Sequence, residues 1–107
     1  MMFDKFCIEK ILSGEKTVTR RLDSVRRPGV PGAIHKLKVD RTPKTFGKIM
    51  IISCRREQIK DITEEEAFKE GFDSLNEYLA YFMEVNDVDI LFRSDWIWRV
   101  EFKLING

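Results

Sequence analysis

A lysine and two threonines stand close together in the first fifth of this sequence, at a spacing that suits acid–base or nucleophilic chemistry. Lys16, Thr17 and Thr19 follow Gly14, where a helix is expected to give way to a strand. Burial lowers the pKa of a lysine amine and can turn it into a general base. A threonine hydroxyl beside such a base can act as a nucleophile or orient a water molecule. These residues form a candidate catalytic group that still lacks a carboxylate.

Candidate carboxylates lie in an acidic segment further along the chain. Glu70 comes last in a predicted helix, just before Gly71, and the alternatives are Glu64, Glu65 and Glu66. Spacing alone does not choose among these four. Each residue of the candidate group also has a purely structural explanation. Lys16 can neutralise the carbonyl end of the preceding helix, the threonines suit a strand, and Glu70 can be a solvated helix residue.

The first half of the chain supplies the elements that must position this group. Asp4 and Gly14 are typical of the start and the end of a helix, which is predicted over residues 4–13. A strand follows over 16–22, where Thr17, Thr19 and Arg21 share one face. Prolines and glycines in 23–33 indicate a long loop. Strands are then predicted over 35–40 and 47–54, with a turn at 42–44 between them. The strand over 47–54 is apolar on both faces and is expected to be the most central.

The second half begins with two helices and ends with a strand. Thr63 with Glu66, and Ser74 with Glu77, match the capping box at a helix start. The closing strand is predicted over 95–104, and its apolar alternation places Trp96 and Trp98 in the core, although either ring could stack a base. The order of elements gives no βαβ repeat. It predicts an α+β domain, a small and mostly antiparallel β-barrel or curled sheet with helices at its ends.

Charge is divided unevenly along the chain. Residues 1–60 hold 15 Lys/Arg and 6 Asp/Glu, whereas residues 61–107 hold 4 and 12. This asymmetry indicates either a basic surface that attracts phosphates or two halves that neutralise each other across the fold. The basic side chains that could face a nucleic acid are Arg26, Arg27, Lys36, Lys38, Arg55 and Arg56.

Composition excludes several classes of protein. An apolar content of 43% is enough for a packed core, and no apolar run is long enough to span a membrane. The start of the chain lacks the pattern of a secretory signal, and Cys7 and Cys54 lie far apart, so we expect free thiols and a cytoplasmic location. With one histidine and no close cysteine pair, neither a metal nor a cofactor is expected.

Three segments of the sequence resemble the ASCH domain family of the PUA-like superfamily. The stretch Ile11-Leu-Ser-Gly-Glu-Lys-Thr-Val-Thr-Arg-Arg21 resembles its Gly-x-Lys-x-x-Thr-x-Arg signature. Residues 61–78 are similar to the helical segment of that family, and 98–102 to its final strand. The resemblance implies a PUA-like β-barrel with a central cleft, with one domain over residues 1–107. It also implies a role that involves RNA or a nucleotide.

Small bacterial members of this superfamily are amidohydrolases that remove the acetyl group from N(4)-acetylcytidine. By resemblance, their catalytic residues fall on Lys16, Thr19 and Glu70 of this chain. Arg21 is then the first candidate for a substrate contact, with Thr17 and Arg20 beside it. The loop over 23–33, with two arginines and two prolines, differs from the shorter acidic loop of those enzymes.

We therefore hypothesise a domain that binds RNA or a modified nucleoside in its cleft and hydrolyses an amide on the base. In this hypothesis a neutral Lys16 takes a proton from Thr19 or from water, and Glu70 orients the lysine or passes the proton to the departing amine. The alternatives are a non-catalytic RNA-binding module and a metal-independent ribonuclease.

Overall fold

The structure, a computed structural model, describes residues 1–24, 26–39, 42 and 44–105. Within these residues the order of elements is β1 (Met2–Phe3), α1 (Lys5–Ser13), β2 (Val18–Leu22), β3 (Ile34–Val39), β4 (Thr45–Gln58), a 3-10 turn (Ile59–Asp61), α2 (Glu64–Lys69), α3 (Leu75–Val85) and β5 (Trp96–Ile105). The predicted turn at 42–44 lies partly outside the described residues. No helix among the described residues is long and apolar enough to cross a membrane.

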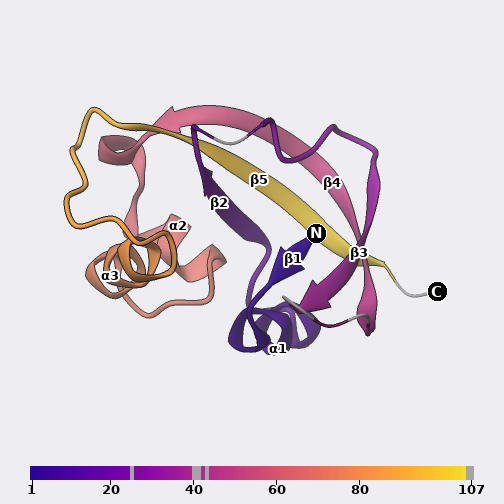
Figure 1. Ribbon diagram of the computed structural model, residues 1–107. Coiled ribbons are helices and arrows are strands. Elements are labelled where there is room, and N and C mark those ends of the chain that lie inside the picture. Colours follow the sequence, from indigo (N-terminus) through magenta and orange to yellow (C-terminus); the bar gives the residue numbers. More distant parts are fainter. Residues whose placement is uncertain (25, 40–41, 43, 106–107) are drawn as a thin grey trace.

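The strands form one mixed sheet in the order β1-β3-β4-β5-β2. The β1–β3 pair is parallel, and the other neighbours are antiparallel. The predicted α+β class with a mostly antiparallel sheet is therefore confirmed. The hydrogen-bonded order ends at β1 and β2, so of the predicted barrel or curled sheet the structure has the curled, open sheet. Figure 1 shows β4 and β5 curving together over β2.

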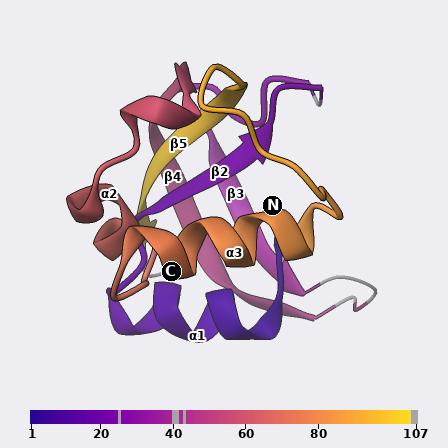
Figure 2. The ribbon, with the colours of Figure 1, turned by 90° about the vertical axis from the view of Figure 1, so that its left-hand side faces the viewer.

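The helices begin and end where the capping residues predict. The side chain of Asp4 accepts from the amide of Cys7 at the start of α1, and Gly14 ends that helix with a φ of +87°. Thr63 and Ser74 cap α2 and α3 in the same way. Figure 2 shows α3 in front of the sheet and α1 below it. Phe6 of α1 packs against Tyr81 of α3 in a tilted arrangement, with ring centroids 6.2 Å apart.

Strand β4 is central in the sheet, as predicted, but it continues four residues beyond Cys54. The sequence of this extension is Arg-Arg-Glu-Gln, which gives no apolar pattern. Arg55–Gln58 nevertheless pair with the first half of β5. The register shifts between Ile51 and Ser53, which marks a β-bulge. A bulge bends its strand, and this one lies between the two halves of β4.

The prediction that Trp96 belongs to the core is wrong, because 46% of Trp96 is exposed. Its neighbour Ile97 is buried, and so is Arg99, whereas Val100 and Phe102 are buried further along β5. The buried face of the strand thus changes sides at Arg99 and Val100. Simple alternation from the apolar end of the strand cannot show this change.

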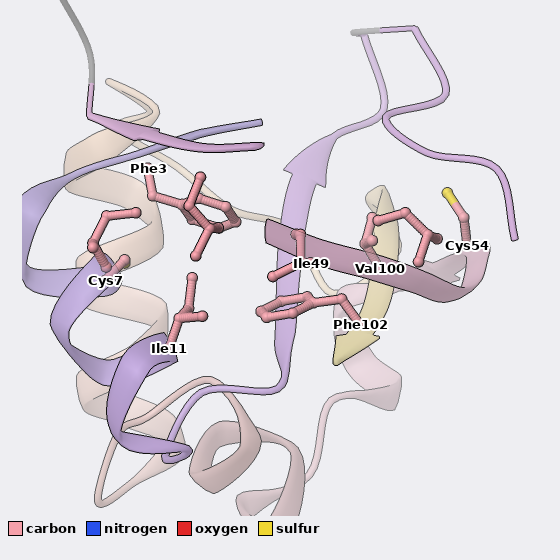
Figure 3. Packing of buried hydrophobic residues seen from close by; sticks show 10 residues of the cluster. Phe3, Cys7, Ile11, Ile49, Cys54, Val100 and Phe102 are labelled. Atoms are coloured by element: carbon pink, nitrogen blue, oxygen red, sulfur yellow. The ribbon is translucent and has the colours of Figure 1, made fainter. Parts of the chain in front are cut away.

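Two apolar clusters hold the sheet and helices together. The larger one packs α1 and β1 against β3, β4 and β5, and Figure 3 shows Phe3, Cys7 and Ile11 facing Ile49 and Phe102. The second cluster packs Tyr78 and Phe82 of α3 against Ile97. Burial of such side chains supplies most of the stabilisation of a small domain. Between the clusters lie β2 and the end of α2, which carry the polar residues described next.

Candidate functional site

A pocket of about 400 Å³ opens between β2, α3 and the start of α1. It lies where the two apolar clusters meet, and it is walled by both polar and apolar side chains. Its lining consists of Met2, Phe3, Asp4, Cys7, Lys16, Thr19, Arg20, Arg21, Glu70, Tyr78, Tyr81, Phe82, Val85 and Asn86. We call it the central pocket. Its size suits a small organic ligand.

Lys16 is fixed by the junction between α1 and β2. Its backbone amide donates to the carbonyl of Lys10 at 3.1 Å, after the left-handed Gly14 has ended the helix. The next amide, of Thr17, donates to the carbonyl of Lys69 at 2.8 Å, which ties this segment to α2. The Lys16 side chain is almost fully buried, and its Nζ donates to the carbonyl of Val18 at 2.9 Å. The lysine is therefore held at the pocket wall with little freedom.

Glu70 meets Lys16 from the opposite side. It is the C-terminal cap of α2, and the following Gly71 has a φ of +90°, which turns the chain sharply away. The Nζ of Lys16 donates to Glu70 Oε1, and Nη1 of Arg20 donates to Glu70 Oε2 at 3.0 Å. Both carboxylate oxygens are thus occupied by cations. Of the four candidate carboxylates, Glu70 is the one that lines the central pocket.

Arg20 is held by three carboxylates, one from β4 and two from α2 and its C-terminal cap. Its Nε lies 2.6 Å from Oε1 of Glu57 on β4, and its two terminal nitrogens donate to Glu70 and Glu66. Burial alone would lower the pKa of Arg20, but the negative charges of Glu70 and Glu57 raise it above its ordinary value. Because these carboxylates use the edges of the guanidinium group, the geometry of Arg20 suits positioning of Glu70 more than contact with a substrate.

Glu66 joins a second buried arginine to the same set of charges. It accepts from Arg20 and from Arg99, and Lys69 lies 3.2 Å away on the same helix. Hydrogen bonds from Arg99 lower the pKa of Glu66 to about 2, although burial opposes the shift. The sequence did not single out Arg99 or Glu57. Glu57 lies in a strand extension without an apolar pattern, so only its position opposite Arg20 reveals its function in this cluster.

Two tyrosines of α3 complete the polar part of the wall. Burial, together with the charge of Glu70, raises the pKa of Tyr78 far above its ordinary value, so its phenol stays neutral. The hydroxyl of Tyr81 donates to Asp4, and Cys7 Sγ lies 3.0 Å from the same hydroxyl. Burial and these contacts likewise raise the pKa of Tyr81. Helical spacing in the sequence gives no sign that these two rings face a pocket.

The other predicted contact residues fall in different places. Thr19 is buried and lines the central pocket. Arg21 lines it as well, donates to the carbonyl of Met2 at 2.9 Å and lies over the ring of Phe3. Thr17 is exposed and is not part of the pocket lining. The structure thus brings Lys16, Thr19, Arg20, Arg21 and Glu70 together in the pocket lining and leaves Thr17 outside.

The basic residues predicted to face a nucleic acid are mostly exposed but do not form one group. Lys36 and Lys38 lie on β3, which β4 and β5 separate from β2. Arg27 donates to the carbonyl of Cys54 at 3.2 Å and so places its loop against β4, where Arg56 pairs with Asp23 at 2.8 Å. Arg26 and Arg55 are exposed.

Some of the charges of the basic and acidic halves of the chain neutralise each other inside the fold. Lys16 and Arg20 of the basic half make buried ion pairs with Glu70 and Glu66 of the acidic half. Neutralisation across the fold therefore accounts for two of the basic side chains, and exposed arginines remain. Among the described residues, no group of three or more His, Cys, Asp or Glu side chains is arranged to hold a metal ion.

Comparison with known proteins gives structural neighbours but no match at the level of sequence families. No protein-family model matches the sequence, and no curated protein matches it. The fold is similar to an ASCH domain from Lactobacillus crispatus, with a TM-score of 0.70 and 25% identity, over 92% of this chain and 70% of the other. It is similar to an ASCH protein from Zymomonas mobilis, with a TM-score of 0.65 and 18% identity, over 99% of this chain and 68% of the other.

A third neighbour broadens the comparison. A DUF984 protein from Enterococcus faecalis has a TM-score of 0.72 and 12% identity, over 95% of this chain and 68% of the other. At such low identity the likeness concerns the fold. The neighbours that are ASCH proteins support the ASCH resemblance of this chain at the level of the fold.

Proposed function

We propose that this chain, which has the fold of an ASCH domain, binds a modified nucleoside in its central pocket and hydrolyses an amide on the base. The observation that carries the proposal is the buried contact between Lys16 and Glu70 at the wall of a pocket that Thr19 also lines. A paired base and acid beside a hydroxyl group provide what amide hydrolysis needs. The substrate proposed on the basis of the family resemblance is N(4)-acetylcytidine.

The chemistry begins with a proton transfer within the pair. Because Nζ of Lys16 touches Oε1 of Glu70, the lysine can give its proton to the carboxylate and become a neutral base. Neutral Lys16 then takes a proton from Thr19 or from a water molecule. The oxygen attacks the carbonyl carbon of the acetyl group and forms a tetrahedral intermediate.

Collapse of that intermediate breaks the bond between the carbonyl carbon and the exocyclic nitrogen. The nitrogen leaves with a proton supplied by the Lys16–Glu70 pair, which gives cytidine. When water attacks, acetate forms directly. When Thr19 attacks, an acetylated threonine forms first, and water activated by Lys16 releases acetate from it. Arg20 holds Glu70 throughout, since its Nη1 remains on the second carboxylate oxygen.

The test is a turnover assay on N(4)-acetylcytidine with the purified protein, in which chromatography follows the appearance of cytidine. Turnover should vanish in Lys16→Ala and in Glu70→Gln, with the circular dichroism spectrum unchanged. Arg55→Gln, which alters an exposed residue away from the pocket lining, is the matched control and should retain activity. Absence of turnover at high enzyme concentration would refute the hydrolase proposal for the free nucleoside.

The second candidate function is RNA binding without catalysis, and the exposed arginines of the 23–33 loop and of β4 favour it. Binding of this kind weakens steeply as salt rises, because phosphate contacts release counterions. It should not respond to Thr19→Ala. A ribonuclease would be recognised by cleavage of RNA without added metal.

A further inference from the structure

A second pocket, of about 340 Å³, lies beyond the end of β2 and has Trp96 in its wall. We call it the tryptophan pocket. Leu22 and Ile97 give it an apolar floor, and Asp23 and Asp95 contribute carboxylates. In Figure 1 the loop after α3 rises to the start of β5, and residues of this loop close the pocket. Neither the family resemblance nor the proposed reaction accounts for this site.

Trp96 has the arrangement of a stacking platform. It is 46% exposed, although the strand around it is strongly apolar. The guanidinium of Arg56 lies 4.9 Å from the centre of its ring, and Asp23 holds that guanidinium by an ion pair of 2.8 Å. A tryptophan that carries a cation on one side can still take a flat ring against its remaining surface. Exposed aromatic rings beside arginines bind unpaired bases in proteins that recognise single strands.

Positive charge next to the platform suits the phosphates of such a strand. Arg27 is exposed and reaches the carbonyl of Cys54, two residues along β4 from Arg56. The nearby carboxylates are engaged, since Asp23 pairs with Arg56 and Asp95 accepts from the amide of Phe92 at 2.8 Å. A carboxylate can accept several hydrogen bonds, so Asp23 and Asp95 can also accept from the amino group of a base. Arg56 and Arg27 can therefore meet a phosphate beside the pocket, whereas the charged residues of the lining itself are the carboxylates of Asp23 and Asp95.

Residues that line the two pockets follow one another along the chain in two places. On β2, Thr19 lines the central pocket, and Asp23, just past the end of this strand, lines the tryptophan pocket. After α3, Asn86 belongs to the first and Val88 to the second. Four residues of extended chain span about 13 Å. A few nucleotides of a single strand cover this length, so one strand can reach both pockets.

We propose that the tryptophan pocket binds an unpaired base of an RNA strand, with Trp96 stacked on the base and Arg56 and Arg27 facing the adjacent phosphates. The nucleotide that carries the reactive amide then occupies the central pocket, and this assignment of the two positions rests on the function proposed above. The natural substrate class is accordingly a modified nucleotide within single-stranded RNA.

The test compares binding of a short fluorescein-labelled single-stranded oligouridine that contains one cytidine, measured by fluorescence anisotropy. Trp96→Ala should weaken binding about tenfold, the effect of losing one stacked base. Phe68→Ala removes an aromatic ring of similar exposure from α2 and should leave binding unchanged. Arg56→Gln should lower the slope of log affinity against log salt by about one phosphate contact. Equal affinity of Trp96→Ala and the parent protein would overturn the proposal.

A spectroscopic measurement locates the base directly. The chain has two tryptophans, so Trp98→Phe leaves Trp96 as the sole indole reporter. The RNA should quench its fluorescence, and the same RNA should leave Trp98 unaffected in Trp96→Phe. Quenching of Trp98 alone would also overturn the proposal. Turnover of free N(4)-acetylcytidine should be the same in Trp96→Ala and the parent protein, so a failure of the hydrolase proposal is seen separately from a failure of RNA binding.

Discussion

The ammonium group of Lys16 donates to the carboxylate of Glu70, 54 positions further along the chain, and both side chains are almost completely buried. A buried ion pair is favourable only when the other donors and acceptors of its two side chains are also hydrogen-bonded. Here the carbonyl of Val18 takes another hydrogen of the ammonium group, and Arg20 takes the other carboxylate oxygen. The pair is therefore part of a larger buried cluster of charges.

Replacing Lys16 and replacing Glu70 should destabilise the fold by different amounts. Lys16→Met leaves Glu70 paired with Arg20, so we expect a loss of about 1–3 kcal/mol in the free energy of unfolding. Glu70→Leu leaves both Lys16 and Arg20 short of a partner, and we expect about 3–5 kcal/mol. Urea unfolding followed by circular dichroism measures both values. A larger loss for Lys16→Met than for Glu70→Leu would show that Arg20 does not support the carboxylate.

Arg20 should act as a positioning residue for Glu70. Arg20→Lys retains the charge, but a single ammonium group cannot span Glu57, Glu66 and Glu70 as a guanidinium does. We expect a loss of about 3 kcal/mol in stability and a fall in kcat with KM little changed. Arg56→Lys alters an exposed pair and should shift stability by less than about 1 kcal/mol. A rise in KM alone would identify Arg20 as a substrate contact.

A fall in pH should lower the free energy of unfolding, because Glu66 becomes protonated. Its pKa falls from 4.5 in the unfolded chain to about 2 in the folded protein, where Arg99 donates to it. A carboxylate with a lowered folded pKa contributes stability that is present above about pH 4.5 and is lost as pH falls toward 2. The full contribution is about 3 kcal/mol. Glu66→Gln should flatten the dependence of unfolding free energy on pH in this range, and Glu9→Gln, at an exposed position, should not.

Two glycines with the same backbone conformation should respond differently to alanine. Gly14 and Gly71 have φ values of +87° and +90°, which costs an alanine about 1–2 kcal/mol at each site. A Cβ at Gly14 meets no atom within 4 Å, whereas one at Gly71 would lie 2.7 Å from Cδ of Lys10. Gly71→Ala should therefore lose more stability than Gly14→Ala, and it should also impair catalysis because Glu70 is adjacent. Equal thermal unfolding temperatures would contradict this prediction.

Local patterns in the sequence predicted much of the fold. The caps at Asp4, Thr63 and Ser74 are where the sequence places them, because a side chain that bonds a nearby amide needs only its own turn of helix. The central position of β4 was predicted for a similar reason, since apolar residues on both faces require cover on both faces. The exposure of Trp96 was missed, because the buried face of β5 changes where the sheet curls.

By itself, the sequence determined the caps, the class of fold and a candidate group of Lys16, Thr17, Thr19 and one of four glutamates, since these depend on residue type and short spacing. Spacing left four glutamates open and the family resemblance pointed to Glu70, but only the tertiary structure shows the contact, because Glu70 reaches the lysine from another element across 54 positions. The same holds for Glu57, which pairs with Arg20 across β5, and for the second pocket beside Trp96. Contacts between distant segments depend on how the sheet curls and how the helices pack on it, and no local pattern encodes that geometry.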